Sequence, residues 1–264
     1  MIQPHRNRRQ LPAPGAAAIA AQAPGGPMAR CCPIVELRQY TLHAGMRETL
    51  IALFERDFLT TQADVGIEVI GQFRDLDDPN RFVWMRGFPD MAARATALGA
   101  FYGGPAWKAG AKAANATMID SDNVLLLHPL GADGGFDRAR AAPKRPGLVV
   151  VEIRYLDRAS LPAFCAFYAA TMAPRMAAAG ATPLAAFVTE DSPNSFPRLP
   201  IRENATVLVS ILGFSGAAAH RAYQAALAAG PDWREVAGDP LLAQFMRKPE
   251  ILRLEPAARS RLRG

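Results

Sequence analysis

The chain has 264 residues, half of them hydrophobic and a fifth charged, and its net charge is +6. Such a composition is typical of a globular protein with a sizeable core. Arginines within residues 1–30, a segment without acidic residues, supply four of the six net positive charges. The rest is nearly balanced, so we expect no nucleic-acid partner. No apolar run approaches the roughly 20 residues that cross a bilayer, so we expect no membrane span.

Residues 1–30 are rich in Ala, Pro, Gly and Arg, and such a segment buries too little apolar surface to fold. Several explanations stay open: a disordered tail, an export leader suggested by Arg8 and Arg9, or an Arg-rich organelle-targeting segment. We favour a start assigned too early, with Met28 as the true first residue, because a strand is expected shortly after it. Each explanation leaves this segment outside the fold.

The cysteines are Cys31, Cys32 and Cys165. Their odd number and the adjacency of two of them do not suit a disulfide framework, so a reducing compartment and a cytoplasmic location are expected. The histidines are widely separated, and neither a His-Glu-x-x-His nor a Cys-x-x-Cys motif is present. The sequence therefore predicts no metal and no cofactor.

The first predicted unit spans residues 31–130 and opens with a strand at 34–40. Glu36 and Arg38 are two apart on this strand, so they point to the same face. A helix with Gly66 at its end, a hairpin of two strands at 67–73 and 82–88, and a second helix from Asp90 are predicted next. Gly103, Gly104 and Pro105 break that helix. A polar loop at 118–123 and an apolar strand at 124–129 complete the unit.

Residues 131–147 hold Gly, Pro and basic residues without periodicity and are expected to form a linker. The second predicted unit spans residues 148–258 and repeats the same order. Its elements are a strand at 148–156, a helix at 160–180, a strand at 183–189, a Pro-rich turn region at 190–204, a strand at 206–214, a helix from Ser215 to 229 that restarts near Trp233, and a strand at 251–255.

Matching landmarks follow one another in both units, which indicates an internal repeat. They are Glu36/Arg38 with Glu152/Arg154, Phe73 with Phe187, Gly87-Phe88 with Gly213-Phe214, Trp107 with Trp233, and Pro129 with Pro256. The predicted fold is α+β: two tandem ferredoxin-like β-α-β-β-α-β units.

The motifs of the first unit resemble the NIPSNAP family: Val-Glu-Leu-Arg-x-Tyr-Thr-Leu at 35–42, a Gly-x-Phe strand at 71–73 and Pro-Ala-Trp-Lys at 105–108. The second unit resembles a divergent copy that keeps Val-Glu-Ile-Arg and Pro-Asp-Trp. The resemblance implies a dimeric α+β barrel, with both halves of the barrel in one chain. That group includes cofactor-free monooxygenases, haem-handling enzymes and isomerases, but the family has no firmly shared reaction, so the resemblance implies fold and not chemistry.

Two sets of residues are candidates for a ligand site in the barrel interior. Glu36 and Arg38 could bind a polar ligand there, or form an ion pair that stabilises the sheet. Phe82, Trp84 and Arg86 share one strand face and suit a hydrophobic ligand with one anionic or carbonyl group. They could equally pack against helices. Their second-unit counterparts, Ser210 for Trp84 and Leu212 for Arg86, are small or apolar, which predicts an asymmetric cavity.

Tyr102 and Trp107 lie where the second helix is broken and could edge the mouth of that cavity. Because Trp107 has a counterpart in Trp233, a structural role is an alternative for it. With Tyr40 of the first strand, the predicted ligand-binding residues are Phe82, Trp84, Arg86, Glu36, Arg38, Tyr40, Tyr102 and Trp107.

The sequence thus favours a protein that binds a small apolar or aromatic molecule in its barrel and carries out cofactor-independent oxidation or isomerisation there. The alternative is a non-enzymatic assembly or scaffold protein that uses its sheet edges and outer helix faces. Homo-oligomerisation is left open.

Overall fold

The computed structural model of the chain describes residues 30–137, 147–230 and 248–264. Nearly all of the predicted N-terminal tail, most of the predicted linker and Trp233 lie outside these residues. Eight antiparallel strands close into a barrel in the order β10-β3-β4-β2-β5-β8-β9-β7. The strands are β2 (Ile34–Leu42), β3 (Glu68–Asp75), β4 (Arg81–Phe88), β5 (Met118–Pro129), β7 (Leu148–Tyr155), β8 (Thr182–Thr189), β9 (Val207–Phe214) and β10 (Glu250–Pro256).

The two halves of the chain each contribute four neighbouring strands, and they meet at two seams. At one seam β5 pairs with β8 and Pro129 lies opposite Phe187. At the other, β10 pairs with β3 and Pro256 lies opposite Phe73. The landmark prolines and phenylalanines of the two halves therefore meet each other across the seams. A proline is tolerated there because it stands at the strand's last residue.

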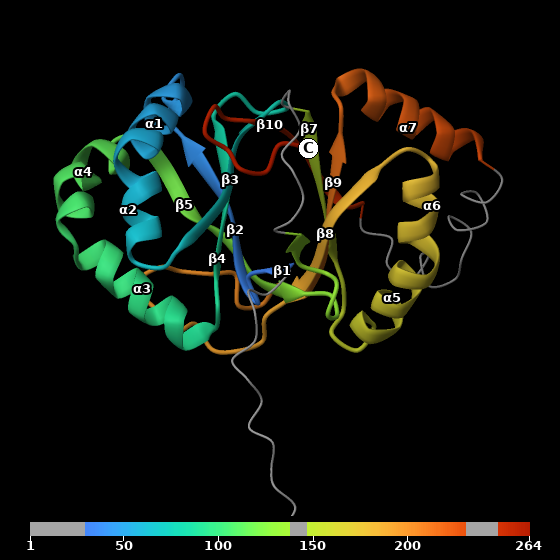
Figure 1. Cartoon of the computed structure of the whole chain (residues 1–264), viewed down its shortest axis with the longest axis horizontal. Helices are drawn as coiled ribbons and strands as arrows, with labels where there is room; N and C mark the ends of the chain where they lie inside the picture. Colours follow the sequence, from blue (N-terminus) through green and yellow to red (C-terminus); the bar gives the residue numbers. More distant parts are fainter. Residues whose placement is uncertain (1–29, 138–146, 231–247) are drawn as a thin grey trace, which may run out of the picture.

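Helices cover the barrel on two opposite sides (Figure 1). One side carries α1 (Arg47–Leu53), η1 (Phe54–Phe58), α2 (Leu59–Asp64), α3 (Met91–Gly103) and α4 (Pro105–Asn115). The other carries α5 (Leu161–Phe167), η2 (Tyr168–Met172), α6 (Ala173–Ala178) and α7 (Ala217–Ala229). The elements η1 and η2 are π-helical turns inside otherwise continuous helices, which the sequence pattern did not predict. Asp90 caps α3 through the backbone N–H of Ala93, as predicted.

The barrel interior is a packed apolar core. It combines strand residues of both halves, among them Val35, Leu37, Val149 and Val151, in one buried cluster. Because side chains alternate along a strand, Glu36 and Arg38 point to the opposite face, beneath helices α1–α4. The expected ligand site inside the barrel was therefore wrong in its location: an eight-stranded barrel is just wide enough for side chains to fill.

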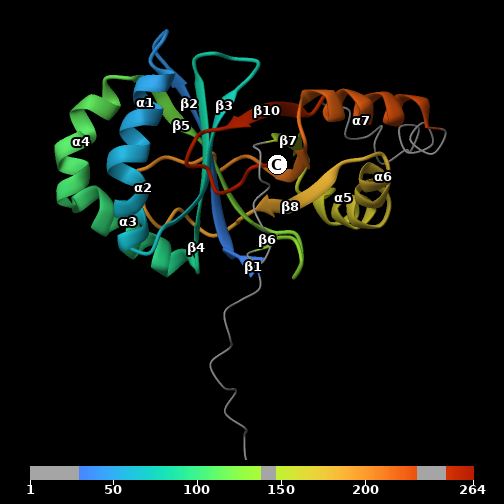
Figure 2. The same cartoon turned by 45° about the horizontal axis from the view of Figure 1, so that its top comes forward.

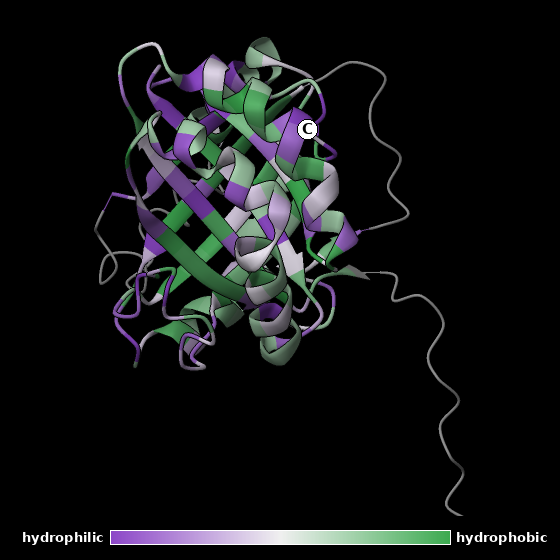
Figure 3. Ribbon diagram, turned by 90° about the vertical axis from the view of Figure 1, so that its left-hand side faces the viewer, coloured by the Kyte–Doolittle hydropathy of each residue, from purple (hydrophilic) through white to green (hydrophobic). Residues whose placement is uncertain are grey.

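The outer helices follow the expected amphipathic pattern, and Figure 3 shows hydrophilic and hydrophobic residues alternating along them while the strands behind are mostly hydrophobic. The break at Gly104 falls between α3 and α4, as predicted. Residues 118–123 were predicted as a loop, but β5 begins at Met118 and this part of it pairs with the end of β2. The run of four polar residues at 120–123 hid the strand.

A short ribbon forms where the linker was expected. β1 (Arg30–Cys31) pairs with β6 (Phe136–Asp137), and Phe136 is buried in the interior core. Cys31 and Cys32 are joined by a disulfide, which was not anticipated. A bond between adjacent residues closes no long loop, so it does not act as a framework for the fold. None of the described helices is long and apolar enough to cross a membrane.

The seams predict that the barrel unfolds as one unit. Phe73 and Phe187 are both fully buried at a seam, and truncating either should cost about 3–5 kcal/mol. We expect F73A and F187A each to shift a single cooperative transition in chemical denaturation. Truncation of the exposed Ile119 is the control and should have little effect. Two separate transitions, one per half, would contradict a shared core.

Candidate functional site

The outer face of β2 and β4 carries the polar and aromatic candidates in three directly opposed pairs. Antiparallel pairing sets Glu36 opposite Arg86, Arg38 opposite Trp84 and Tyr40 opposite Phe82. Six of the predicted ligand-binding residues are thus brought together by register alone, because opposed residues on one face have their Cβ atoms about 5 Å apart.

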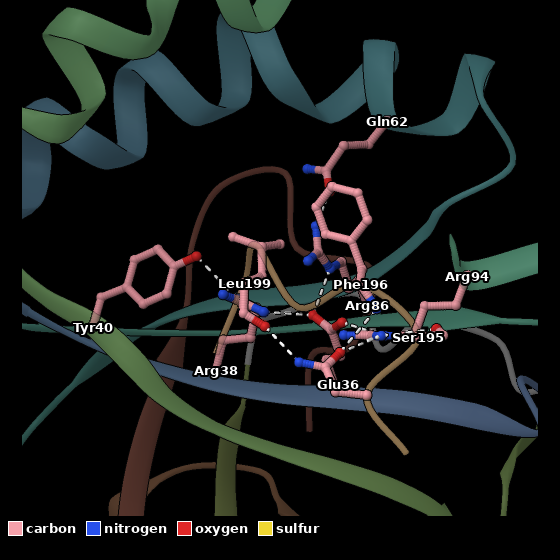
Figure 4. A network of polar contacts seen from close by, with 10 residues as sticks. Glu36, Arg38, Tyr40, Gln62, Arg86, Arg94, Ser195, Phe196 and Leu199 are labelled. Carbon is pink, nitrogen blue, oxygen red and sulfur yellow. Dashed lines mark hydrogen bonds and ion pairs between the residues drawn. The ribbon is translucent and has the colours of Figure 1, made fainter. Parts of the chain in front are cut away.

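A single carboxylate, that of Glu36, binds three arginines. Arg38 donates from Nη1 to Oε2 at 2.6 Å, Arg86 from Nε to Oε2 at 2.7 Å, and Arg94 from Nε to Oε1 at 2.7 Å. The side chains of Glu36, Arg86 and Arg94 are 0 % exposed. Figure 4 shows the three guanidinium groups converging on this carboxylate. We call these four residues the arginine cluster.

Helices and a loop complete the surroundings of the cluster. Gln62 of α2 accepts a hydrogen bond from Arg86 Nη1 at 3.3 Å. Arg94, on α3, donates from Nη1 to Asn194 Oδ1 and to Ser195 Oγ, both at 3.0 Å. These last two residues belong to the connection 190–206 between β8 and β9, which Figure 1 shows as an orange trace that reaches across to the α3 side. The second half of the chain therefore covers a site built by the first half.

The cluster carries two more positive charges than negative ones. Burial alone would raise the pKa of Glu36, but the charges of Arg86, Arg38 and Arg94 outweigh it and hold that pKa well below its usual range. Burial lowers the pKa of Arg94, and Glu36 offsets only part of this effect. Such a set of guanidinium groups repels cations, so it is not a metal site. It is an anion-binding arrangement with one internal counter-ion.

Three buried donors of the site have no hydrogen-bond partner among the described residues: Arg86 Nη2, Arg94 Nη2 and Trp84 Nε1. Leaving a buried donor unpaired costs about 1–3 kcal/mol, and more for a charged one. The unpaired guanidinium nitrogens mark where an additional acceptor would be stabilised.

Aromatic rings surround the guanidinium groups. Arg38 Cζ lies 5.4 Å from the ring centre of Tyr40 and 5.5 Å from that of Trp84. Arg86 Cζ lies 5.0 Å from Trp84 and 5.8 Å from Tyr102. Tyr102 in turn stacks on Phe196 of the covering loop, with ring centres 6.0 Å apart. The site is therefore cationic at its centre and aromatic at its wall.

The structure separates two predicted residues from the arginine cluster. Phe82 packs against Tyr40 and Phe54. Trp107 packs against Phe58 and Tyr102, at the outer edge of the same aromatic layer. Both belong to the apolar core beneath α1–α4, and the described contacts of Trp107 support the structural alternative stated for it.

Among the described residues of the second half, no equivalent cluster is present. Glu152 and Arg154 form an ion pair at 3.1 Å, and their side chains are 12 % and 19 % exposed. Ser210 lies opposite Glu152 and Leu208 opposite Arg154. The counterparts assigned from the sequence, Ser210 for Trp84 and Leu212 for Arg86, agree with the pairing of β3 with β4 and of β8 with β9, in which even the bulges fall at matching positions. The match of Glu36/Arg38 with Glu152/Arg154 was wrong by two positions, because Arg86 lies opposite Glu36 whereas Leu212 lies opposite Val150. The outer faces of β4 and β9 therefore differ, with Trp84 and Arg86 on one and Ser210 and Leu212 on the other.

Sequence reasoning missed Arg94, Gln62, Asn194 and Ser195. Arg94 shares its helix face with the buried residues Ala97, Leu98 and Phe101, so a charged residue on an apolar stripe was a usable signal. The loop residues carry no periodic signal, since only tertiary contacts bring them to the site.

Replacing the central carboxylate should destabilise the protein strongly. Glu36→Gln keeps the shape but leaves three buried arginines without a counter-ion, and removing one partner of a buried ion pair typically costs 3–5 kcal/mol, so we expect a loss of about this size. The free energy of unfolding from denaturant titration is the measurement. Glu152→Gln in the half-buried pair is the matched control and should cost about 1 kcal/mol or less. Equal losses in the two variants would contradict the central role of Glu36.

The lowered pKa of Glu36 predicts a specific acid sensitivity. A carboxyl whose pKa is lower in the folded than in the unfolded chain contributes its full stability above the unfolded value of about 4.3. That contribution is lost as the pH falls further toward the folded value. We therefore expect the unfolding free energy of the wild type to drop more steeply below about pH 4 than that of Glu36→Gln. Parallel pH profiles for the two proteins would exclude this linkage.

Comparison with known proteins agrees with the barrel. The described fold resembles a provisionally assigned monooxygenase from Lactobacillus acidophilus, with a TM-score of 0.53 and 16 % identity over 85 % of this chain and 94 % of that one. A provisionally assigned monooxygenase from Fusobacterium nucleatum has a TM-score of 0.57 and 9 % identity over 85 % and 92 % of the two chains. An anthrone oxidase-like protein has a TM-score of 0.56 and 13 % identity over 87 % and 94 %. At these identities the likeness shows the fold alone.

The sequence comparison is more specific. No curated protein matches the chain. The family model that matches is NIPSNAP, and it covers residues 35–131, the half that contains β2 to β5 and the arginine cluster. The motifs at 35–42, 71–73 and 105–108 lie within this range. Residues 35–131 are therefore a NIPSNAP domain.

Proposed function

We propose that the protein binds a small, largely aromatic molecule with one anionic oxygen group between the β2–β4 face and helices α2 and α3. The observation that carries this proposal is the buried excess of positive charge, together with the unpaired Nη2 atoms of Arg86 and Arg94. A buried charge without a partner is costly, and a carboxylate, phenolate or enolate would compensate it. The rings of Trp84 and Tyr102 suit the aromatic part of such a ligand.

The proposed reaction is cofactor-independent oxidation by dioxygen, or isomerisation, of a substrate that passes through an oxyanion. Preorganised donors in a water-poor site stabilise such an anion far better than water does. Glu36 does not serve as a general base, because three arginines lower its pKa and leave it a weak proton acceptor. In this proposal the arginine cluster lowers the energy of the substrate anion. Gln62 holds Arg86 in place, and Asn194 holds Arg94 in place.

The proposal extends to the organisation of the chain. We infer that residues 31–130 and 148–258 are tandem ferredoxin-like units, of which the second is a divergent copy. Each contributes strands in the same relative order, and the seams repeat the same Pro–Phe opposition. In this arrangement one half retains the charged site and the other supplies its cover.

Binding can be tested with a matched pair of probes, 2-naphthoate and the neutral 2-naphthamide, which share their shape. We expect the anion to raise the melting temperature in differential scanning fluorimetry and the amide to have little effect, because only the anion compensates the cluster. Arg94→Gln should weaken the response to the anion by about tenfold, the expected size for loss of one charged hydrogen bond. Arg154→Gln, in the half without a cluster, should leave it unchanged.

Catalysis needs a separate measurement. Anthrone is a suitable probe because it is planar, forms an oxyanion when it loses a proton from its methylene carbon, and reacts with dioxygen to give anthraquinone and water. We expect oxygen consumption and anthraquinone formation above the spontaneous rate, reduced in Arg94→Gln. If 2-naphthoate binds but anthrone is not oxidised faster than spontaneously, the binding part of the proposal stands and the oxidation of anthrone does not. If neither probe binds, a non-enzymatic assembly role would replace the proposal.

A further inference from the structure

Two sulfur atoms and a carboxylate gather at one end of the barrel, away from the arginine cluster. Cys31 ends β1 and Cys32 follows it, and the two are joined by a disulfide. Cys32 Sγ lies 3.6 Å from Glu68 Oε2 at the start of β3. The donor atoms of Cys31, Cys32 and Glu68 all lie within 4.8 Å of one another. Figure 2 shows β1 beside β6 at this end of the barrel.

The backbone around the pair is shaped to hold it inside. Cys31 and Cys32 are 4 % and 3 % exposed and pack against the interior core. Cys32 has a φ of 65°, the left-handed region that side chains other than glycine rarely adopt. Gly87 of β4 makes this possible, because a Cβ atom there would collide with the Cys32 side chain. Strain of this kind, about 1–2 kcal/mol, persists where the surrounding structure enforces it and is a pointer to a function.

Glu68 is oriented by a second partner and reaches the solvent. Its Oε1 accepts a hydrogen bond from Arg261 Nη1 at 3.1 Å, while its Oε2 faces Cys32. The Glu68 side chain is 22 % exposed. Together with Leu59, Gly66 and Arg261 it lines a surface groove of 420 Å³. Glu68 therefore borders both this groove and Cys32.

We propose that Cys31, Cys32 and Glu68 form a binding site for a divalent ion of the zinc class once the disulfide is reduced. A dithiol reductant supplies two electrons and two protons, breaks the S–S bond and is itself oxidised to a disulfide. The ion then displaces one proton from each thiol and is held by two thiolates and one carboxylate oxygen. Water from the groove occupies the fourth position of the tetrahedral set that zinc prefers. The three donor atoms already lie within 4.8 Å of one another, so a shared ion requires only short displacements of the donors.

The charges favour the ion over isolated thiolates. Two thiolates and Glu68 carry three negative charges, which a divalent ion reduces to one, and Arg261 balances the last. Thiolate ligands select soft or borderline ions, so magnesium and calcium do not fit this donor set. A charged partner that orients a ligating carboxylate is a common feature of metal sites and typically contributes about 10–100-fold in affinity.

The test uses the full chain, reduced with a phosphine and desalted without oxygen. Co²⁺ should give the thiolate charge-transfer and tetrahedral d–d absorption bands at one equivalent, and Zn²⁺ should abolish them. Competition with a chromophoric chelator measures Zn²⁺ affinity. We expect Cys32→Ser to lower the Zn²⁺ affinity at least about 100-fold, more than is typical for a residue that only orients a ligand. Arg261→Gln should lower it about tenfold. Cys165→Ser is the matched control and should bind as the wild type does.

A measurement on the wild type alone guards against a variant that does not fold. Zn²⁺ should protect Cys31 and Cys32 of the reduced protein from alkylation, read by peptide mass spectrometry, while Cys165 stays as reactive as without the ion. The oxidised protein should bind no Co²⁺. Unprotected cysteines and no Co²⁺ spectrum in reduced, folded protein would overturn the proposal. So would a Co²⁺ signal that depends on Cys165.

Discussion

One buried carboxylate surrounded by three arginines is the interaction on which the first half of this protein depends. Glu36 joins β2 to β4 through Arg86 and joins the sheet to α3 through Arg94. In water these contacts would be weak, but inside the protein each unpaired charge would be very costly. The helices on this side can therefore take up only the arrangement that keeps all three guanidinium groups within reach of Glu36.

The same cluster links the two halves of the chain. Arg94 also donates to Asn194 and Ser195, so the connection between β8 and β9 is fixed against the helices of the other half. The corresponding connection between β3 and β4 spans only residues 76–80, and its contacts with the second half are those of Leu76 and Asp77 with Arg253 of the neighbouring strand β10. The seams of the barrel are alike on both sides, whereas the charged site and its cover occur on one side among the described residues.

The order of the strands could be predicted because its signals are local: alternation, glycine and proline at element ends, and a motif that recurs. The shared face of Glu36 and Arg38 follows from the period of a strand. Which side of the sheet that face would occupy could not be derived, since both sides of a barrel strand are buried. Ser195 was out of reach because nothing near it in sequence reveals its contact with Arg94. The Glu36/Arg38 and Glu152/Arg154 pairs were matched wrongly because the same Glu-x-Arg motif recurs two positions further along β7 than the strand pairing requires.

A barrel built from one chain can make its two outer faces different, which two identical chains cannot do. The excess positive charge beneath α3 is covered by a loop from the other half, whose own outer face carries the Glu152–Arg154 pair and no arginine cluster among the described residues. The loop closes through Phe196, which stacks on Tyr102, and through hydrogen bonds to Arg94. A ligand that enters must therefore displace or pass contacts made between the halves. In the proposed function, anion binding is therefore coupled to the position of this loop, because the anion pairs with the same guanidinium group that binds Asn194 and Ser195.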